Sequence, residues 1–312
     1  MTLSGRPKPR VIVIVGPTGV GKTEMALKLA GRWKGEIVSA DSMQVYRGMD
    51  IGTAKPTVDQ RRRIPHHLID VVDPDGTFDA SRYCDLARSV IAGLHGEKKN
   101  VFVVGGTGLY VRALLGGLIV GPGRDDQLRR ELWEKIERSG NAGLHGRLQD
   151  SDPRAAARIN PHDRVRIIRA LEVFELTGRS IVDHQEGHRF QERPYETLII
   201  GLMLERERLR AGIDLRTERM IADGFVEEVR GLLAKGYDRS LRPMQSLGYR
   251  HLVACLAGES TLEEAVCRIK RDTYRYARRQ MTWFSAEREL VWHAPDDFTA
   301  AAERVGRFLG ET

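Results

Sequence analysis

The residues with the clearest chemical role form a glycine-rich segment near the start of the chain, which we call the phosphate loop. It matches the spacing GxxxxGK[ST] and consists of Gly16, Pro17, Thr18, Gly19, Val20, Gly21, Lys22 and Thr23. In such a loop, backbone N–H groups turn toward phosphate oxygens, the lysine contacts the outer phosphate and the last hydroxyl binds magnesium. We therefore predict a polyphosphate site with Mg2+ as its cofactor and Thr23 as its metal ligand.

A carboxylate and a hydroxyl, Asp41 and Ser42, follow a short apolar run at residues 36–40. In open α/β sheets, ligands bind at the carboxyl ends of the strands, so we expect Asp41 to lie beside the phosphate loop. There it would hold magnesium or accept a proton. The alternative is a local role, because Asp-Ser pairs are common in turns and at helix N-termini.

The apolar run at residues 101–104 ends in Gly105-Gly106-Thr107. A standard ATPase has an Asp at this point, which is linked to its magnesium ion. Asp70 or Asp73 could take that role instead. The motif alone therefore leaves open which polyphosphate is bound.

Five short apolar runs are typical of buried strands, and several are separated by helical patterns: residues 11–15, 36–40, 101–104, 198–204 and 290–292. This order predicts the α/β class, with a P-loop NTPase-like parallel sheet flanked by helices. Long helices are expected at 22–33, 205–235 and 261–285. Between these segments, residues 121–194 are charged and helical, with breaks at Gly140, Pro153, Pro161 and Gly178. We predict a catalytic core of residues 1–120 and 195–312 with a helical insertion domain at 121–194.

The bulk composition limits partners and location. The 312 residues include 50 Lys and Arg against 43 Asp and Glu, a net charge of +7 that favours acidic partners such as nucleic acid. No apolar run is long enough for a membrane span or a signal peptide, so no membrane role is expected. Cys84, Cys255 and Cys267 lack the spacing of a zinc site or a disulfide framework. We expect a cytoplasmic protein that acts as a monomer.

Several longer blocks extend the pattern beyond the phosphate loop. They are Asp41-Ser42-Met43-Gln44-Val45-Tyr46-Arg47-Gly48-Met49-Asp50-Ile51-Gly52-Thr53-Ala54-Lys55-Pro56, Pro65-His66-His67-Leu68-Ile69-Asp70, Gly105-Gly106-Thr107-Gly108-Leu109-Tyr110, Arg169-Ala170-Leu171-Glu172-Val173, Gly248-Tyr249-Arg250 and Ala277-Arg278-Arg279-Gln280-Met281-Thr282-Trp283. In this order, the chain resembles the bacterial tRNA dimethylallyltransferases, also called tRNA isopentenyltransferases. The resemblance covers nearly the whole chain.

The resemblance implies a reaction and a set of catalytic residues. In that family, the phosphate loop holds the diphosphate of dimethylallyl diphosphate as a leaving group, and Arg216 would add a positive contact. The acceptor is the exocyclic amine of the adenosine adjacent to the anticodon in tRNAs that read codons beginning with U. Asp41 would take the proton as the new C–N bond makes that nitrogen cationic. Thr107 would orient the reacting group, or else its hydroxyl satisfies the glycine turn. Val20 departs from the small residues frequent in the family, and we expect slight crowding there.

The tRNA anticodon stem-loop is the second expected partner. On a helix at 268–279, Ile269, Tyr276 and Trp283 fall on one stripe, while Arg268, Arg271, Arg275, Arg278 and Arg279 fall on the opposite side. Such a face is either merely solvated or binds phosphates, and the family blocks favour phosphates. The residues predicted to contact tRNA are Asp41, Ser42, Met43, Gln44, Arg166, Arg169, Gln245, Gly248, Tyr249, Arg250, Arg271, Arg275, Arg278 and Arg279. Of these, Arg166 and Arg169 lie in the insertion.

Three other functions compete with this interpretation. A P-loop small-molecule kinase fits the loop and the sheet but would consume ATP. An adenylate-directed isopentenyltransferase shares the loop, although the insertion and the arginine-rich helix favour tRNA. A non-catalytic RNA-binding protein leaves the phosphate loop and Asp41 without a role. His66 and His67 are interpreted as structural or substrate-shaping residues.

Overall fold

A hydrophobic strand, β1 (Arg10–Val15), lies inside a six-stranded parallel sheet in the computed structural model, which describes residues 8–118, 123, 125–188 and 192–310. The sheet order is β3-β2-β4-β1-β5-β6. The other strands are β2 (Gly35–Ser39), β3 (His66–His67), β4 (Asn100–Gly105), β5 (Glu196–Leu202) and β6 (Leu290–His293). The predicted α/β class with a parallel sheet is confirmed.

The side chains of β1 alternate between two hydrophobic cores, one on each face of the sheet. Val11, Val13 and Val15 pack into the first core, and Ile12 and Ile14 pack into the second. All five are fully buried, and burial of such a side chain contributes roughly 1.5–3 kcal/mol. This two-sided burial explains why the strand is a continuous apolar run.

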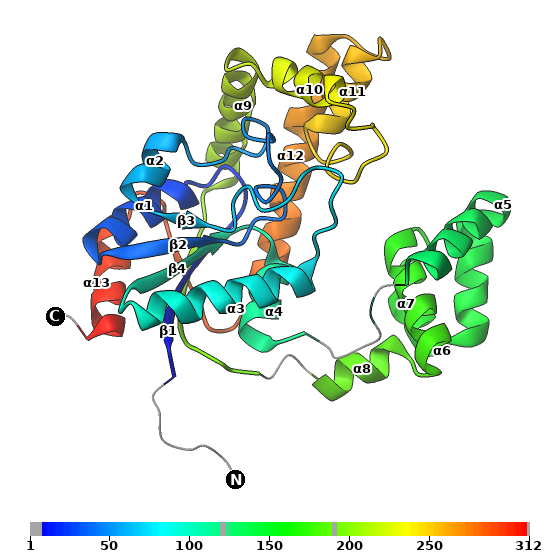
Figure 1. The fold of residues 1–312 in the computed structure, drawn as a ribbon, viewed down its shortest axis with the longest axis horizontal. Helices are drawn as coiled ribbons and strands as arrows, with labels where there is room; N and C mark the ends of the chain where they lie inside the picture. The colour runs from blue at the N-terminus through cyan, green and yellow to red at the C-terminus, as the bar shows by residue number, and fades with distance from the viewer. Residues whose placement is uncertain (1–7, 119–122, 124, 189–191, 311–312) are drawn as a thin grey trace. The chain divides into compact units, whose positions relative to one another are not determined.

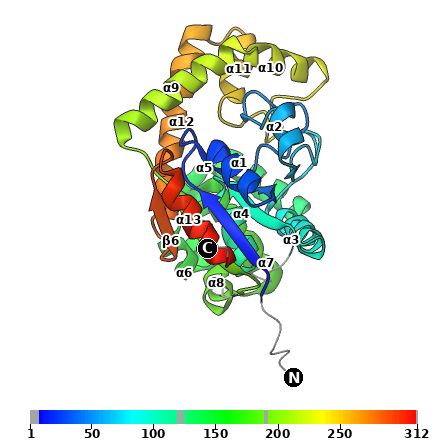
Figure 2. The ribbon, with the colours of Figure 1, turned by 90° about the vertical axis from the view of Figure 1, so that its left-hand side faces the viewer.

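Helices cover both faces of the sheet. The first core receives side chains from α3 (Ala80–Gly96), α4 (Gly108–Gly116), α10 (Phe225–Ala234) and α11 (Tyr249–Leu256). The second receives them from α1 (Lys22–Arg32) and α13 (Phe298–Leu309), which lie together in Figure 2. Two longer helices, α9 (Arg206–Ala222) and α12 (Leu262–Phe284), contact each other, and α2 (Val58–Arg63) precedes β3.

Two details differ from the sequence-based expectation. The strand β3 was not predicted, because two residues are too few to give an alternating pattern. The segment 205–235, expected to supply long helices, forms two helices, α9 and α10, because the chain turns at Gly224 with φ 97°. That backbone conformation favours glycine.

The chain divides into two units, Met1–Leu115 with Arg193–Thr312, and Gly116–Glu192. The second unit, drawn mainly in green in Figure 1, contains α5 (Asp126–Ser151), α6 (Pro153–Arg158), α7 (Arg164–Thr177) and α8 (Ile181–His188). The helix α5 is interrupted at Gly140, which has φ 69°. Within the described ranges, every helix is too short or too polar to cross a bilayer.

Candidate active site

The phosphate loop connects the end of β1 to the start of α1, and its glycines make the turn possible. Gly19 and Gly21 have φ values of 82° and 98°, which side chains rarely adopt. A Cβ on Gly16 would lie 2.5 Å from the carbonyl oxygen of Leu202. Val20 is 1% exposed and packs into the second core, so the predicted crowding of the diphosphate by this side chain is wrong.

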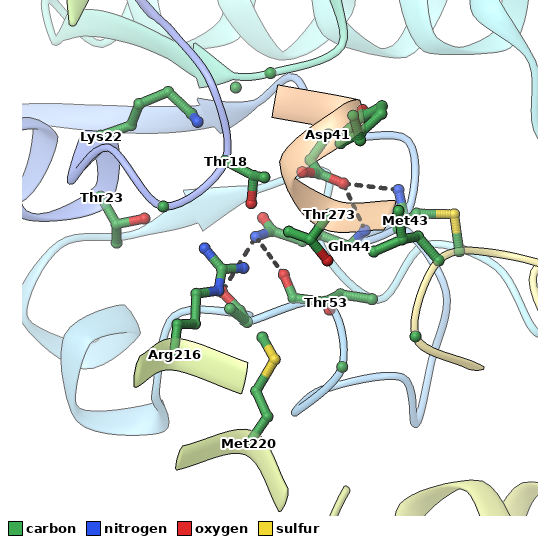
Figure 3. Close-up of a pocket in the computed structure, with 18 of the residues that line it drawn as sticks. Thr18, Lys22, Thr23, Asp41, Met43, Gln44, Thr53, Arg216, Met220 and Thr273 are labelled. Carbon is green, nitrogen blue, oxygen red and sulfur yellow. Dashed lines mark hydrogen bonds between the residues drawn. The ribbon is translucent and has the colours of Figure 1, made fainter. Parts of the chain in front are cut away.

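Two cationic side chains reach the same space from different helices. The Nζ of Lys22 donates to the carbonyl oxygens of Gly16 at 3.0 Å and Pro17 at 2.8 Å. Arg216 extends from α9, and Figure 3 shows it facing the region of Lys22 and Thr23. Burial and the nearby Arg216 lower the pKa of Lys22 to about 7, whereas Asp41 acts in the opposite direction. Burial likewise lowers the pKa of Arg216.

Asp41 follows β2 and forms a tight turn with the residues after it. Its Oδ1 accepts hydrogen bonds from the backbone N–H groups of Met43 at 2.8 Å and Gln44 at 3.3 Å, as Figure 3 shows. Its Oδ2 has no hydrogen-bond partner in the part of the chain that the structure describes. One carboxylate oxygen therefore holds the turn, and the other is available to a ligand.

The hydroxyl of Thr107 supports this turn. Its Oγ1 accepts the backbone N–H of Ser42 at 3.0 Å, and its own N–H donates to the carbonyl of Ala40 at 3.1 Å. Thr107 does not line the cavity. Its visible contacts match the alternative in which the hydroxyl satisfies the turn, and its orientation of the reacting group remains a prediction.

One cavity of about 920 Å³ is lined by residues of the phosphate loop, including Lys22, and by Asp41 and Arg216. The predicted site residues that line it are Thr18, Gly19, Gly21, Lys22, Thr23, Asp41, Ser42, Met43, Gln44, Arg216, Gln245, Gly248, Tyr249, Arg250, Arg275 and Arg279. Those of the first unit that do not line it are Gly16, Pro17, Val20, Thr107, Arg271 and Arg278. The cavity brings together groups that bind anions with one that can accept a proton.

An apolar wall of the cavity was missed by the sequence analysis. Ile213 and Met220 come from α9, and Ile269 and the ring of Tyr276 come from α12. The phenol of Tyr276, placed on the packing stripe of its helix by its periodicity, lines the cavity. Burial raises its pKa, and the negative charge of Asp41 adds to the effect. The helical period therefore gave the correct face but did not reveal that this face meets a cavity.

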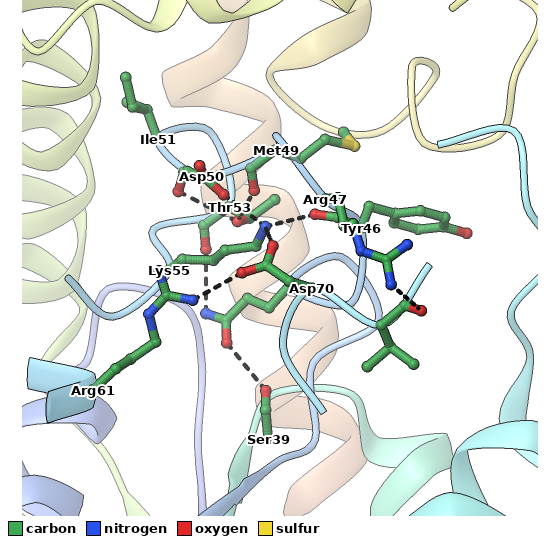
Figure 4. Close-up of polar contacts among 12 residues, drawn as sticks. Ser39, Tyr46, Arg47, Met49, Asp50, Ile51, Thr53, Lys55, Arg61 and Asp70 are labelled. Atoms are coloured by element: carbon green, nitrogen blue, oxygen red, sulfur yellow. Dashed lines mark hydrogen bonds and ion pairs between the residues drawn. The ribbon is translucent and has the colours of Figure 1, made fainter. Parts of the chain in front are cut away.

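Residues 44–55, which belong to the longest of the sequence blocks that carry the family resemblance, are held in place by polar contacts (Figure 4). Lys55 is 2% exposed at its side chain, and its Nζ contacts the carbonyl of Tyr46 at 2.5 Å and the carboxylates of Asp50 at 2.7 Å and Asp70 at 2.5 Å. Arg61 binds the other oxygen of Asp70 at 2.8 Å. Asp70 is thus fully engaged in ion pairs.

Neither aspartate considered as a magnesium-linked substitute is suited to that role. Asp70 is bound as described above, and Asp73 pairs with Arg47 at 3.2 Å. Neither residue lines the cavity. The possibility that they replace the missing ATPase aspartate is therefore wrong.

The side-chain amide of Gln44 is hydrogen-bonded to the same segment and to β2. Its amide nitrogen donates to the carbonyls of Thr53 at 3.4 Å and Ala54 at 3.3 Å, and its oxygen accepts from the hydroxyl of Ser39 at 3.0 Å. The predicted contact between Gln44 and tRNA therefore has to be made through the remaining surface of the residue.

Glu228, which the sequence analysis did not single out, organises residues 50–52. Its carboxylate accepts the backbone N–H groups of Asp50 at 2.8 Å, Ile51 at 2.7 Å and Gly52 at 3.1 Å. It also accepts the hydroxyl of Tyr249 at 2.6 Å. Tyr249 is 1% exposed, and burial and Glu228 raise the pKa of its phenol. Very little of the Tyr249 surface is therefore open to a predicted contact with tRNA.

The arginines of α12 lie on its exposed face, as the periodicity predicts, while Ile269 is buried. Asp272 binds Arg271 and Arg275 of this helix and also Arg250 of α11. Its carboxylate accepts from Arg250 at 2.8 Å, Arg271 at 3.0 Å and Arg275 at 3.4 Å. Burial alone would raise the pKa of Asp272, but hydrogen bonds from Arg271, His251 and Arg250 lower it to about 2. Asp272 therefore remains an anion that orients these guanidinium groups.

The second unit has a carboxylate at its centre. Glu172 is fully buried and binds Arg129 at 2.8 and 2.9 Å and Arg169 at 2.6 Å. Burial alone would raise the pKa of Glu172, but these hydrogen bonds lower it. Arg166 is exposed and pairs with Asp163 at 3.2 Å. Both insertion residues predicted to contact tRNA, Arg166 and Arg169, therefore lie on α7.

The metal site expected at Thr23 has few protein ligands. Thr23 lines the cavity next to Lys22. No group of three or more His, Cys, Asp or Glu side chains suited to a metal occurs among the described residues. One hydroxyl with substrate oxygens and waters fits Mg2+, which usually keeps several waters and uses few protein ligands.

Comparison with known proteins identifies similar chains. The IPP transferase family matches residues 44–287. A curated relative from Syntrophus aciditrophicus, tRNA dimethylallyltransferase 2, is 57% identical over 302 residues, which cover 97% of each chain. The crystal structure of full-length tRNA isopentenylpyrophosphate transferase from Bacillus halodurans has a TM-score of 0.72 at 40% identity and covers 97% of this chain and 96% of that one. A eukaryotic dimethylallyltransferase described as acting on tRNA has a TM-score of 0.82 at 26% identity, covering 97% of this chain and 80% of that one.

Proposed function

This chain belongs to the IPP transferase family, and we propose that it transfers a dimethylallyl group from dimethylallyl diphosphate to the exocyclic amine of an adenosine adjacent to the anticodon of tRNA. The observation that carries the proposal is that Lys22, Arg216 and Asp41 line the same cavity. A phosphate loop alone suits a kinase. A carboxylate that faces two cations suits a reaction that needs both a bound leaving group and a proton acceptor.

The cations would act on the leaving group. In the proposed reaction, the C–O bond between the allylic carbon and the diphosphate breaks, and its electron pair leaves with the diphosphate. Lys22, Arg216 and the backbone N–H groups of the phosphate loop supply positive potential where this charge develops. An anion in the loop would also raise the lowered pKa of Lys22, because it favours the ammonium form.

Asp41 would act on the nucleophile. The exocyclic nitrogen of adenosine forms the new C–N bond and becomes cationic as it does so. Asp41 Oδ2 would then accept the proton, while Oδ1 remains bonded to the turn at Met43 and Gln44. The products are prenylated adenosine, free diphosphate and a proton on the carboxyl group, which returns to water.

Thr23 would hold Mg2+ together with diphosphate oxygens and water, in keeping with its place beside Lys22. When bound, the ion supplies further neutralisation of the charge on the departing diphosphate. The apolar side chains of Ile213 and Met220 would receive the five-carbon group, because they line the same cavity without offering it hydrogen bonds.

We propose that the arginines of α11 and α12 bind the phosphates of the anticodon stem-loop. Arg250, Arg275 and Arg279 line the cavity, so a flipped adenosine would pass them on its way to Asp41. The second unit would contribute Arg166 and Arg169. We further propose that the substrates are tRNAs that read codons beginning with U, and that the protein works in the cytoplasm as a monomer.

The proposed function is tested by incubating the pure protein with dimethylallyl diphosphate, Mg2+ and unmodified tRNA, without ATP. We expect N6-dimethylallyl adenosine in the digested tRNA, detected by mass spectrometry. A kinase would give no such product and would transfer phosphate from ATP to a small acceptor. Free AMP offered in place of tRNA separates the adenylate-directed activity, and we expect no prenylated AMP.

A further inference from the structure

Gln280 is a buried polar residue on a helix whose opposite face is rich in arginine. It lies on α12 and is 6% exposed, with the buried residues Ala277 and Phe284 on the same side of the helix. Buried amides are nearly always hydrogen-bonded, because desolvation without a partner is costly. The partners of Gln280 therefore indicate what the residue does.

The amide of Gln280 joins two loops at the site. Its Oε1 accepts the backbone N–H of Thr18 in the phosphate loop at 2.8 Å, and its Nε2 donates to the carbonyl of Gly106 at 2.8 Å. A Cβ on Gly106 would lie 2.2 Å from that nitrogen, so the amide packs directly on the glycine. Among uncharged side chains of this length, only a primary amide offers a donor and an acceptor at once.

The connection continues from Gly106 to the turn that carries Asp41. The next residue, Thr107, donates its N–H to the carbonyl of Ala40 at 3.1 Å and accepts the N–H of Ser42 at 3.0 Å. A Cβ on Gly105 would lie 2.1 Å from the Ala40 oxygen, so the two backbones are in close contact. A continuous set of hydrogen bonds thus runs from the phosphate loop through Gln280 to the Asp41 turn.

We propose that Gln280 is a positioning residue that sets the separation between the phosphate loop and Asp41. This inference rests on the proposed function, in which a diphosphate departs at one end of this connection and a proton is accepted at the other. A misplacement of about 1 Å between reacting groups lowers a rate by about 100-fold. Loss of the amide should therefore reduce turnover more than it reduces the binding of either substrate.

Two substitutions test this role. Gln280→Met keeps the length and the volume but removes both hydrogen bonds, and Gln280→Glu keeps the acceptor for Thr18 but cannot donate to Gly106 when ionised. For both, we expect kcat to fall by about 30-fold or more. The KM for tRNA should stay within about threefold, and the Kd for Mg2+-diphosphate, measured by calorimetry, should stay within about fivefold. As a matched control, Phe284→Leu on the same buried face should lower the Tm with kcat within about twofold.

Three results would overturn the inference. One is a wild-type kcat in Gln280→Met, and another is an equal loss of kcat in Phe284→Leu at matched Tm. The third is a loss of diphosphate affinity as large as the loss of kcat, which would make Gln280 a binding residue only. If Gln280→Met does not fold, Gln280→Glu decides by the same criteria. The proposed function fails separately, when the wild-type protein itself transfers no prenyl group to tRNA.

Discussion

Replacing Asp41 by Asn separates the two roles that the structure gives to this carboxylate. Oδ1 holds the turn through the N–H groups of Met43 and Gln44, and an asparagine oxygen can accept the same two bonds. What Asn cannot do is accept the proton from the attacking nitrogen. A general base contributes at least about 100-fold to a rate, so the barrier should rise by about 3 kcal/mol or more. Asp41→Ala should lose more, because the turn is lost as well.

The affinity for diphosphate should not fall with the rate in Asp41→Asn. Asp41 raises the pKa of both Lys22 and Arg216, so its negative charge partly offsets theirs. Asp41→Asn should therefore bind Mg2+-diphosphate as tightly as the wild type or more tightly. Single-turnover transfer from labelled dimethylallyl diphosphate to tRNA measures the rate, and calorimetry measures the Kd. Asp75→Asn is the matched control, because it makes the same change of acid to amide at an exposed residue that does not line the cavity. Turnover of Asp41→Asn within about threefold of the wild type would refute the base assignment.

Three further predictions concern pH, stability and salt. The pKa of Lys22 is lowered from 10.5 to about 7, so the folded chain binds fewer protons than the unfolded one between these values, and stability should rise with pH across that window. In the same window, the affinity for diphosphate should fall by about tenfold for each unit that the pH rises, because Lys22 loses its proton. In Lys22→Met, only the pH dependence that comes from the titration of the ligand should remain. Lys55→Met should lower the free energy of unfolding by roughly 1–2 kcal/mol in urea titrations. It removes a buried ammonium group from carboxylates that are partly exposed, at 33% for Asp70 and 57% for Asp50. The exposed Lys28→Met should cost less than about 0.5 kcal/mol. Arg278→Ala should reduce the slope of log tRNA affinity against log salt by about 0.7–0.9, and Arg304→Ala on α13 should leave it unchanged; an equal effect in both would contradict a specific arginine face.

The parts of the fold that could be predicted are those specified by neighbouring residues. The continuous apolar run of β1, the glycine spacing that follows it and the periodicity of α12 each have a local physical cause. The position of Asp41 at the carboxyl end of β2 followed from a general rule of parallel sheets. These local features were enough to identify the sheet and one side of the site.

The missed features depend on partners that are distant in the sequence. Glu228 binds backbone groups 176 to 178 residues away, and nothing in its own helix signals this. The direction of the Val20 side chain depends on how the phosphate loop meets the second core. For Gln280 a signal was present, since it is a polar residue four positions after Tyr276 on the packing side of α12. A polar residue on a buried face indicates a contact, but the sequence does not say with which loops.

The most direct test of the account is the stoichiometry of the reaction without ATP. Purified protein, Mg2+, unmodified tRNA and dimethylallyl diphosphate labelled in both the prenyl group and the diphosphate should release one diphosphate for each prenyl group found on tRNA. Release should stop when tRNA is omitted. If prenylated tRNA forms only while ATP is hydrolysed, the phosphate loop does not hold the leaving group. If diphosphate is released without transfer, its departure is not coupled to attack by the adenosine. Either result would contradict the account.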